Sequence, residues 1–225
     1  MTVTAEKMDK EKEKENAALA AVAMIEDHMV VGLGTGSTAY YAITAIAEKV
    51  KQGLQIKAVP TSDQTATLAL SLGIPLTDIN AVDVIDITID GADEFTKEKY
   101  MIKGGGGALL REKIVAAKTK KEIIIADASK LVTHLGKFKL PLEVIPFARG
   151  YVLEELKKQH LQAEVRAFIT DEGNNIIDVT YGKIEDPIAL SAQLNQIIGV
   201  VTHGLFINLA FNILMGEGDQ VKVFS

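Results

Sequence analysis

Short apolar runs alternate with segments of helical periodicity over roughly the first 135 residues of the chain. The apolar runs predict buried strands, at residues 29–32, 55–59, 84–89 and 122–126. The segments around them predict helices, at residues 5–27, 38–52, 63–72 and 108–118. Because strands that alternate with helices assemble into parallel sheets covered by helices, this part of the chain predicts an α/β domain.

After Gly136 the pattern changes to that of a smaller module. Strands are predicted at residues 143–145, 163–169, 175–181 and 200–206, and helices at residues 151–159 and 187–197. The order strand, helix, strand, strand, helix, strand indicates a split βαβ, ferredoxin-like arrangement. Two final strands, predicted at residues 211–214 and 221–224, fit either domain.

Composition narrows the classes of function. The 225 residues are 48% hydrophobic and 24% charged, which is typical of a globular protein. The net charge of −6, from 24 basic and 30 acidic residues, argues against binding to nucleic acid or to anionic membranes. No apolar run reaches the ~18 residues of a membrane span. The charged first helix does not fit a signal peptide, so we expect the mature protein to begin near Met1.

The chain contains no cysteine, which excludes disulfides, thiolate catalysis and cysteine zinc sites. Its 4 histidines are scattered along the sequence and leave little for a histidine metal site. The candidate chemistry therefore lies in hydroxyl, carboxylate and lysine side chains and in glycine-rich backbone.

A glycine-rich loop, GLGTGST at residues 32–38, joins a predicted strand to a predicted helix. Glycines let the backbone approach a ligand closely, and the N–H groups at the start of a helix attract anions, so this loop suits a phosphate. It lacks the third small residue of the dinucleotide fingerprint and the lysine of nucleotide hydrolases. The alternative is a tight turn in which Ser37 or Thr38 caps the helix.

The acidic sequence DGADE at residues 90–94 directly follows a predicted strand. In open α/β sheets, ligands bind beyond the carboxyl ends of the strands. There Asp90 and Asp93 can exchange protons with hydroxyl groups or hold a divalent ion. An acidic turn without a function is the alternative.

Four consecutive glycines occur in KGGGGALLREK at residues 103–113. Such a run is costly in chain entropy and indicates backbone that passes close to another group. Glu112, near the start of the following helix, suits a general base, and Lys103 suits the stabilisation of an oxyanion. Glu112 can equally be a favourable first-turn charge on the helix dipole. Lys130 fits either a phosphate counter-charge or a surface lysine.

Together these segments resemble ribose-5-phosphate isomerase A. The resemblance rests on four motifs in the same order, GLGTGSTA at 32–39, DGADE at 90–94, KGGGGALLREK at 103–113 and IADASK at 125–130. It continues through TSD at 61–63, LGKFKLPLEVIP at 135–146 and DPIA at 186–189. It therefore covers nearly the whole chain except the first dozen residues.

The resemblance implies a Rossmann-like parallel-sheet catalytic domain, residues 1–135 and 207–225, with an inserted ferredoxin-like α+β lid, residues 136–206. It implies interconversion of D-ribose 5-phosphate and D-ribulose 5-phosphate in the non-oxidative branch of the pentose phosphate pathway. It also implies catalysis without a metal or organic cofactor, by a homodimer or homotetramer. From the composition we further expect a cytoplasmic protein with no nucleic-acid or membrane partner.

Carried over by position, the resemblance makes Glu112 the proton acceptor and places Lys14 where the family can offer a lysine to the phosphate. The implied substrate-binding residues are Thr35, Gly36, Ser37, Thr38, Asp90, Gly91, Ala92, Asp93, Lys103, Gly104, Gly105, Gly106 and Lys130. Our hypothesis is that Glu112 moves a proton between two sugar carbons while Lys103 and loop N–H groups stabilise the enediolate. Asp90 and Asp93 then bind hydroxyl groups and assist opening of the sugar ring.

Two other functions remain open on the sequence. One is an isomerase or deaminase that acts on another sugar phosphate, since the same phosphate loop and base serve several substrates. The other is a non-catalytic sugar-phosphate sensor, since regulators can share this architecture. Relative rates on several sugar phosphates would identify an enzyme for another substrate. Binding of a sugar phosphate without turnover would identify a sensor.

Overall fold

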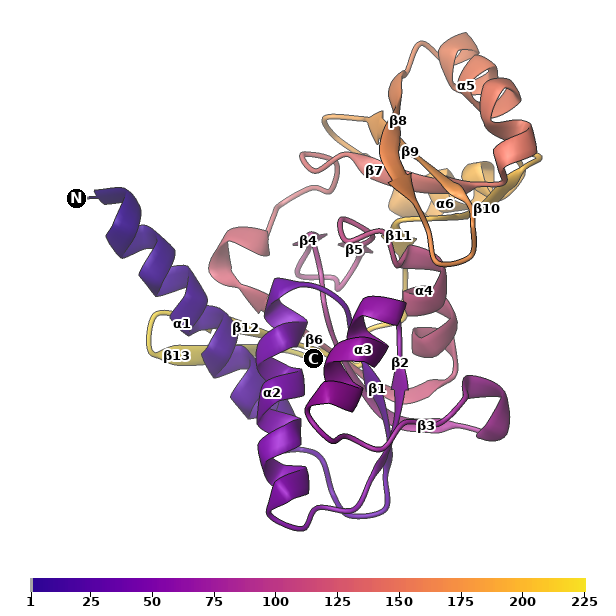
Figure 1. Cartoon of the computed structure of the whole chain (residues 1–225). Helices are drawn as coiled ribbons and strands as arrows, with labels where there is room; N and C mark the ends of the chain where they lie inside the picture. The colour runs from indigo at the N-terminus through magenta and orange to yellow at the C-terminus, as the bar shows by residue number, and fades with distance from the viewer. Residues whose placement is uncertain (1) are drawn as a thin grey trace. The chain divides into compact units, whose positions relative to one another are not determined.

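A computed structural model describes residues 2–225, and the chain passes back and forth between two units (Figure 1). The first unit contains the chain up to Ala92, Ile114–Lys130 and Leu209–Ser225. The second contains Asp93–Lys113 and Leu131–Asn208. Helix α4, Leu109–Ala117, begins in the second unit and ends in the first.

The first unit is built on a six-stranded sheet in the order β13-β12-β6-β3-β1-β2. Neighbouring strands from β12 to β2 are parallel, and only β13 pairs antiparallel with β12. The strands are β1 (Val30–Leu33), β2 (Lys57–Pro60), β3 (Ile85–Gly91), β6 (Thr119–Asp127), β12 (Asn212–Glu217) and β13 (Gln220–Phe224). This is the parallel α/β sheet that the alternating pattern predicts.

Helices of the first unit bury apolar stripes against this sheet. They are α1 (Thr2–Val22), α2 (Ser37–Lys51) and α3 (Asp63–Ser71), with short 3-10 turns at Ile79–Ala81 and Ala128–Lys130. Figure 1 shows α1 alongside α2, and its alanines Ala17, Ala18 and Ala21 are fully buried. Small side chains let the two helices approach closely, which explains the alanine-rich second half of α1.

The second unit contains a four-stranded antiparallel sheet in the order β10-β7-β9-β8. Its elements follow the chain as β7 (Leu140–Val144), a 3-10 turn (Pro146–Ala148), α5 (Arg149–Lys158), β8 (Gln162–Ile169), β9 (Asn175–Thr180), α6 (Pro187–Leu194) and β10 (Val200–His203). The strand order fourth, first, third, second is that of a ferredoxin-like module, so the predicted fold class is confirmed. Asp186 caps α6 by accepting hydrogen bonds from two backbone N–H groups.

A three-stranded sheet completes the second unit, in the order β11-β5-β4. Its strands are β4 (Glu94–Phe95), β5 (Met101–Ile102) and β11 (Leu205–Phe206). The single strand predicted at 200–206 is in fact two, because the chain leaves the four-stranded sheet after β10 and joins the three-stranded sheet after Gly204. A Cβ at Gly204 would overlap the Lys103 carbonyl and Pro141, so the close approach there requires glycine.

Other differences from the sequence analysis are local. The first helix ends at Val22 rather than at residue 27, and strand β3 continues through Gly91, so Asp90 belongs to a strand rather than to a turn. The last two strands form a hairpin on the sheet of the first unit. Residues 93–113, which the sequence analysis counted with the α/β domain, pack in the second unit. The division into a catalytic domain and a lid stays a prediction.

None of the helices described for residues 2–225 is both long and apolar enough to cross a membrane.

Candidate active site

The register between β1 and β3 brings the glycine-rich loop against Asp90. Leu33 pairs with Ile89, so Gly34 follows β1 directly beside Asp90. A Cβ at Gly34 would overlap the Asp90 carboxyl group, and only glycine permits this approach. The Asp90 Oδ1 atom accepts hydrogen bonds from the N–H groups of Thr35 (3.1 Å) and Gly91 (2.7 Å). The buried carboxylate therefore fixes the start of the loop.

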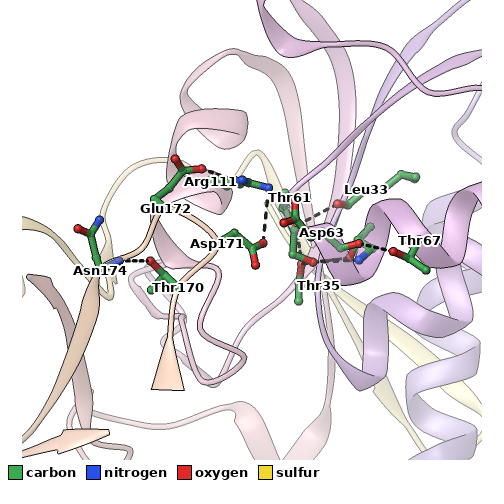
Figure 2. Close-up of polar contacts among 12 residues, drawn as sticks. Leu33, Thr35, Thr61, Asp63, Thr67, Arg111, Thr170, Asp171, Glu172 and Asn174 are labelled. Carbon is green, nitrogen blue, oxygen red and sulfur yellow. Dashed lines mark hydrogen bonds and ion pairs between the residues drawn. The ribbon is translucent and has the colours of Figure 1, made fainter. Parts of the chain in front are cut away.

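The Thr35 side chain belongs to a cluster of hydroxyl groups (Figure 2). Its Oγ1 shares a hydrogen bond of 2.7 Å with Thr61 Oγ1 and donates to Ser62 Oγ at 2.8 Å. Thr61 Oγ1 also donates to the Leu33 carbonyl at 3.0 Å, and Thr65 Oγ1 donates to the Gly34 carbonyl at 2.9 Å. Residues of the TSD sequence at 61–63 thus contact the glycine-rich loop. These hydrogen bonds fix the conformation of the loop.

The start of α2 offers backbone donors that suit an anion. Gly36 precedes the helix with a φ of 111°, a conformation that favours glycine, and no side chain caps the helix. The first N–H groups of α2 therefore remain available to a ligand. A cavity of about 540 Å³ opens here, lined by residues that include Glu11, Gly36, Ser37, Tyr41 and Thr65.

Lys14 of α1 brings a positive charge to this helix start. Its Nζ lies 3.4 Å from Ser37 Oγ and 2.8 Å from Glu11 Oε1. Tyr41 donates to Glu11 Oε2 at 2.6 Å, which raises the pKa of Tyr41 to about 12. The hydrogen bonds from Lys14 and Tyr41 lower the pKa of Glu11, so Glu11 stays anionic and holds the Lys14 ammonium beside Ser37.

A second group of predicted residues lies within the second unit. Glu112, in the first turn of α4, is 4% exposed, and Lys103 is 2% exposed. The Lys103 Nζ atom lies 3.6 Å from Glu112 Oε2 and 5.4 Å from the centre of the Phe206 ring. An ion pair this deeply buried is costly to desolvate. Because such a pair adds little to stability, it marks a candidate functional site.

The tetraglycine loop closes over Asp93. The Gly105 N–H donates to Asp93 Oδ2 at 2.7 Å, and a Cβ at Gly105 would overlap the same carboxyl group. Gly104 has a φ of 101°. Close contacts thus explain Gly104, Gly105 and Gly107, as the sequence predicted for this run of glycines. Asp93, Lys103–Gly106 and Glu112 form one set in the second unit, while Thr35–Thr38, Asp90 and Lys130 belong to the first.

Two basic groups near Lys103, the half-buried Lys113 and the buried His203, were not identified by the sequence analysis. Lys113 Nζ lies 4.8 Å from the centre of the Phe206 ring and donates to the His203 carbonyl at 2.5 Å. Burial lowers the pKa of Lys113 to about 7. Burial, and then the charge of Lys113, lower the pKa of His203 to about 3. His203 is therefore a neutral structural group near neutral pH, and its imidazole Nδ1 accepts from the Leu205 N–H.

His203 is expected to make folding sensitive to mild acid. Its pKa in the folded protein, about 3, lies below the ordinary 6.5, so the unfolded chain binds the proton first as the pH falls. Its contribution to stability is therefore present above about pH 6.5 and is lost as the pH falls towards 3. We expect the drop in melting temperature between pH 7 and pH 4 to be smaller in His203→Gln than in the parent protein. His134→Gln, an exposed histidine of the same unit, is the control, and equal drops in all three proteins would contradict the assignment.

Glu94, the last acid of DGADE, has a structural role. Its carboxylate accepts the N–H groups of Gly136 (2.8 Å) and Phe138 (2.6 Å). Lys130 lies half-buried in a 3-10 turn after β6. Within the described residues, no three histidine, aspartate or glutamate side chains are grouped so that they could hold a metal ion.

Comparisons with known proteins point in one direction. Residues 57–220 match the family model "Ribose 5-phosphate isomerase A (phosphoriboisomerase A)". A ribose-5-phosphate isomerase A of Sphingopyxis alaskensis is 47% identical over 94% of this chain and 95% of its own length. That of Bacillus mycoides is 46% identical over 94% and 98%.

Solved structures agree with the sequence comparisons. A D-ribose-5-phosphate isomerase in complex with phospho-erythronic acid superposes with a TM-score of 0.92 at 41% identity, and the match covers 95% of this chain and 98% of the other. The ribose 5-phosphate isomerase A of Methanocaldococcus jannaschii gives 0.89 at 39% identity, over 93% and 96%. The sequence motifs, the folds of the two units and the relatives all agree. This chain belongs to the ribose-5-phosphate isomerase A family.

Proposed function

We propose that the protein interconverts D-ribose 5-phosphate and D-ribulose 5-phosphate, and that Glu112 carries the proton. The buried pair of Glu112 and Lys103, 3.6 Å apart, is the observation that carries this proposal. A carboxylate in a water-poor setting with an ammonium beside it suits a reaction in which a proton leaves carbon and negative charge develops on oxygen.

The chemistry needs one base and no oxidant. Glu112 removes the proton from C2 of the open-chain aldose, and the electron pair left on C2 forms the enediolate as the C1 carbonyl becomes an oxyanion. The hydroxyl proton on O2 then passes to O1, and Glu112 returns the first proton to C1, which leaves the carbonyl at C2. Lys103 and N–H groups of the tetraglycine loop stabilise the oxyanion, because fixed donors in a dry site cost no reorganisation.

The remaining residues bind the substrate in this proposal. The N–H groups and hydroxyls of Gly36, Ser37 and Thr38 take the phosphate, with Lys14 as counter-charge. Lys130 is a second candidate counter-charge. Asp90 and Asp93 accept sugar hydroxyl protons and assist ring opening.

Turnover in D₂O tests the function directly. Ribose 5-phosphate is incubated with the protein, and proton NMR follows both the formation of ribulose 5-phosphate and the entry of deuterium at the reacting carbons. Arabinose and glucosamine phosphates are assayed in parallel. Faster turnover of one of these would assign another substrate, and binding of phospho-erythronic acid without any turnover would indicate a sensor.

Replacing Lys14 by Met is expected to raise KM for ribose 5-phosphate by about 10-fold, with a smaller change in kcat. A hydrogen bond to a charged group contributes about 1.5–3 kcal/mol, and the phosphate lies far from the reacting carbons. Lys12→Met, on the same helix, is the control, since Lys12 pairs with the exposed Asp219. A KM that is the same in both variants would remove Lys14 from the phosphate site.

The proposal includes a cytoplasmic homodimer or homotetramer that works without a metal or organic cofactor. Light scattering after size exclusion gives the number of subunits. Turnover after exhaustive chelation checks the cofactor. A loss of activity that a divalent ion restores would favour the metal interpretation of Asp90 and Asp93.

A further inference from the structure

The β8–β9 hairpin contacts the segment from Lys103 to Glu112 at several points within the second unit. This hairpin belongs to the region that the sequence analysis treated as a lid. We propose that Arg166 of β8 is a positioning residue that sets the orientation of the tetraglycine loop for catalysis. The inference rests on the proposed function, because it assigns to the loop N–H groups the role described above.

Arg166 joins a carboxylate to the loop through one guanidinium group. Its Nη1 donates to the carbonyls of Gly104 (2.9 Å) and Gly105 (3.1 Å). Its Nε and Nη2 donate to the two oxygens of Asp178 on β9, at 2.8 Å and 2.5 Å. The two-pronged pair with Asp178 fixes the plane of the guanidinium, so the direction of Nη1 is fixed as well.

Peptide planarity turns this contact into control of the loop donors. The carbonyl of one residue and the N–H of the next point to opposite sides of a trans peptide. With the Gly104 carbonyl on Arg166, the Gly105 N–H points the other way, and it is found 2.7 Å from Asp93 Oδ2. The Gly105 carbonyl on Arg166 turns the Gly106 N–H to the side opposite Arg166 in the same manner. Arg166 therefore selects which side of the loop presents its donors.

A run of glycines needs such an external constraint. Without Cβ atoms the loop has access to many backbone conformations of similar energy, which its own sequence does not narrow. The regular pairing of β8 with β9 is interrupted between Val165 and Ile169, and interruptions of this kind re-aim side chains. Arg166 lies within this interruption.

Two further contacts from the hairpin support the same conclusion. The Phe168 ring lies so close to Gly107 that a Cβ there would overlap it. Arg111, next to Glu112 in α4, donates from Nε to Glu172 at 2.5 Å and lies 3.5 Å from Asp171 (Figure 2). The hairpin thus meets both ends of the loop and the first turn of the helix that carries Glu112.

The hairpin turn is itself anchored. The buried carboxylate of Glu143 accepts hydrogen bonds through Oε1 from Thr170 Oγ1 (2.8 Å) and Asn174 Nδ2 (3.0 Å). The Asn174 N–H in turn donates to Thr170 Oγ1 at 3.1 Å (Figure 2). Because its turn is fixed to β7, the hairpin can act as a rigid support for the loop.

The test compares Arg166→Met with the parent protein under steady-state conditions. We expect kcat to fall by about 10- to 100-fold, because a displaced donor or a misplacement near 1 Å costs this much, while KM changes by less than about 3-fold. Arg149→Met, an exposed arginine of the same unit, is the matched control and should keep the parent kcat. We also expect added methylguanidinium to restore part of kcat in Arg166→Met and to leave Arg149→Met unchanged.

A double variant separates positioning from stability. Arg166→Met leaves Asp178 without its cation, whereas Arg166→Met/Asp178→Asn removes both charges. We expect the double variant to regain melting temperature but not kcat. A kcat that returns with the melting temperature, or a single variant with the parent kcat, would overturn the inference.

Failure of this inference is distinct from failure of the function. If the parent protein isomerises ribose 5-phosphate and Glu112→Gln does not, the function stands whatever Arg166→Met shows. If the parent protein shows no turnover, the proposed function fails first.

Discussion

Glu112→Gln is expected to lower kcat for ribose 5-phosphate by at least about 100-fold while the protein remains folded. The amide has the shape of the carboxylate but cannot take a proton from carbon, and a positioned general base is typically worth about 10²–10⁴. Steady-state rates of ketose formation measure the loss. The exchange of substrate hydrogen into D₂O should fall by the same factor, because both depend on the same proton transfer.

Binding provides the control for this variant. Phospho-erythronic acid, which was bound in a solved relative, should bind Glu112→Gln and the parent protein with similar affinity by calorimetry. Glu154→Gln, an exposed glutamate on α5, should keep the parent kcat. Near-normal turnover in Glu112→Gln would remove Glu112 from the role of proton carrier.

Lys103→Met is expected to affect both catalysis and folding. Loss of one fixed donor to a developing oxyanion typically costs about 10²–10³ in kcat. Removing one partner of a buried ion pair also destabilises a protein by about 3–5 kcal/mol. Rates and urea unfolding curves measure the two effects separately.

The double variant Lys103→Met/Glu112→Gln divides these effects. With neither charge buried, the free energy of unfolding should recover, whereas kcat should stay at the level of the worse single variant. A Lys103→Met protein with parent-like kcat would show that the ammonium 3.6 Å from Glu112 does not act on the reaction.

The longer helices and strands could be predicted because their hydrophobic residues follow the pattern typical of each element. The buried run at residues 122–126 is the centre of β6, and the helical pattern at 38–52 is α2 to within a residue at each end. Strands β4 and β5 have two residues each, which is too short for any alternation to be seen. The division at Gly204 depends on the nearby Lys103 carbonyl, which local sequence does not indicate.

The site could be predicted only where glycine or a charged run marked it. The loop near Gly34 was found because close approach requires glycine, and the register of β1 and β3 then accounts for its contact with Asp90. No glycine or charged run marks Arg166 in the sequence. It meets Gly104 from 62 positions away in the sequence, and an arginine in a strand usually lies in solvent.

The boundary of the second unit has a consequence for recombination between relatives. A chimera that exchanges only residues 136–206 would pair a foreign β8 with the native tetraglycine loop and replace the Arg166 that binds the Gly104 and Gly105 carbonyls. Crossovers after Ala92, Lys113, Lys130 and Asn208 transfer Glu112, Lys103 and the hairpin that contacts them together. Exchange of the ferredoxin-like segment alone would thus separate residues that contact one another, whereas exchange of the whole second unit would keep these contacts.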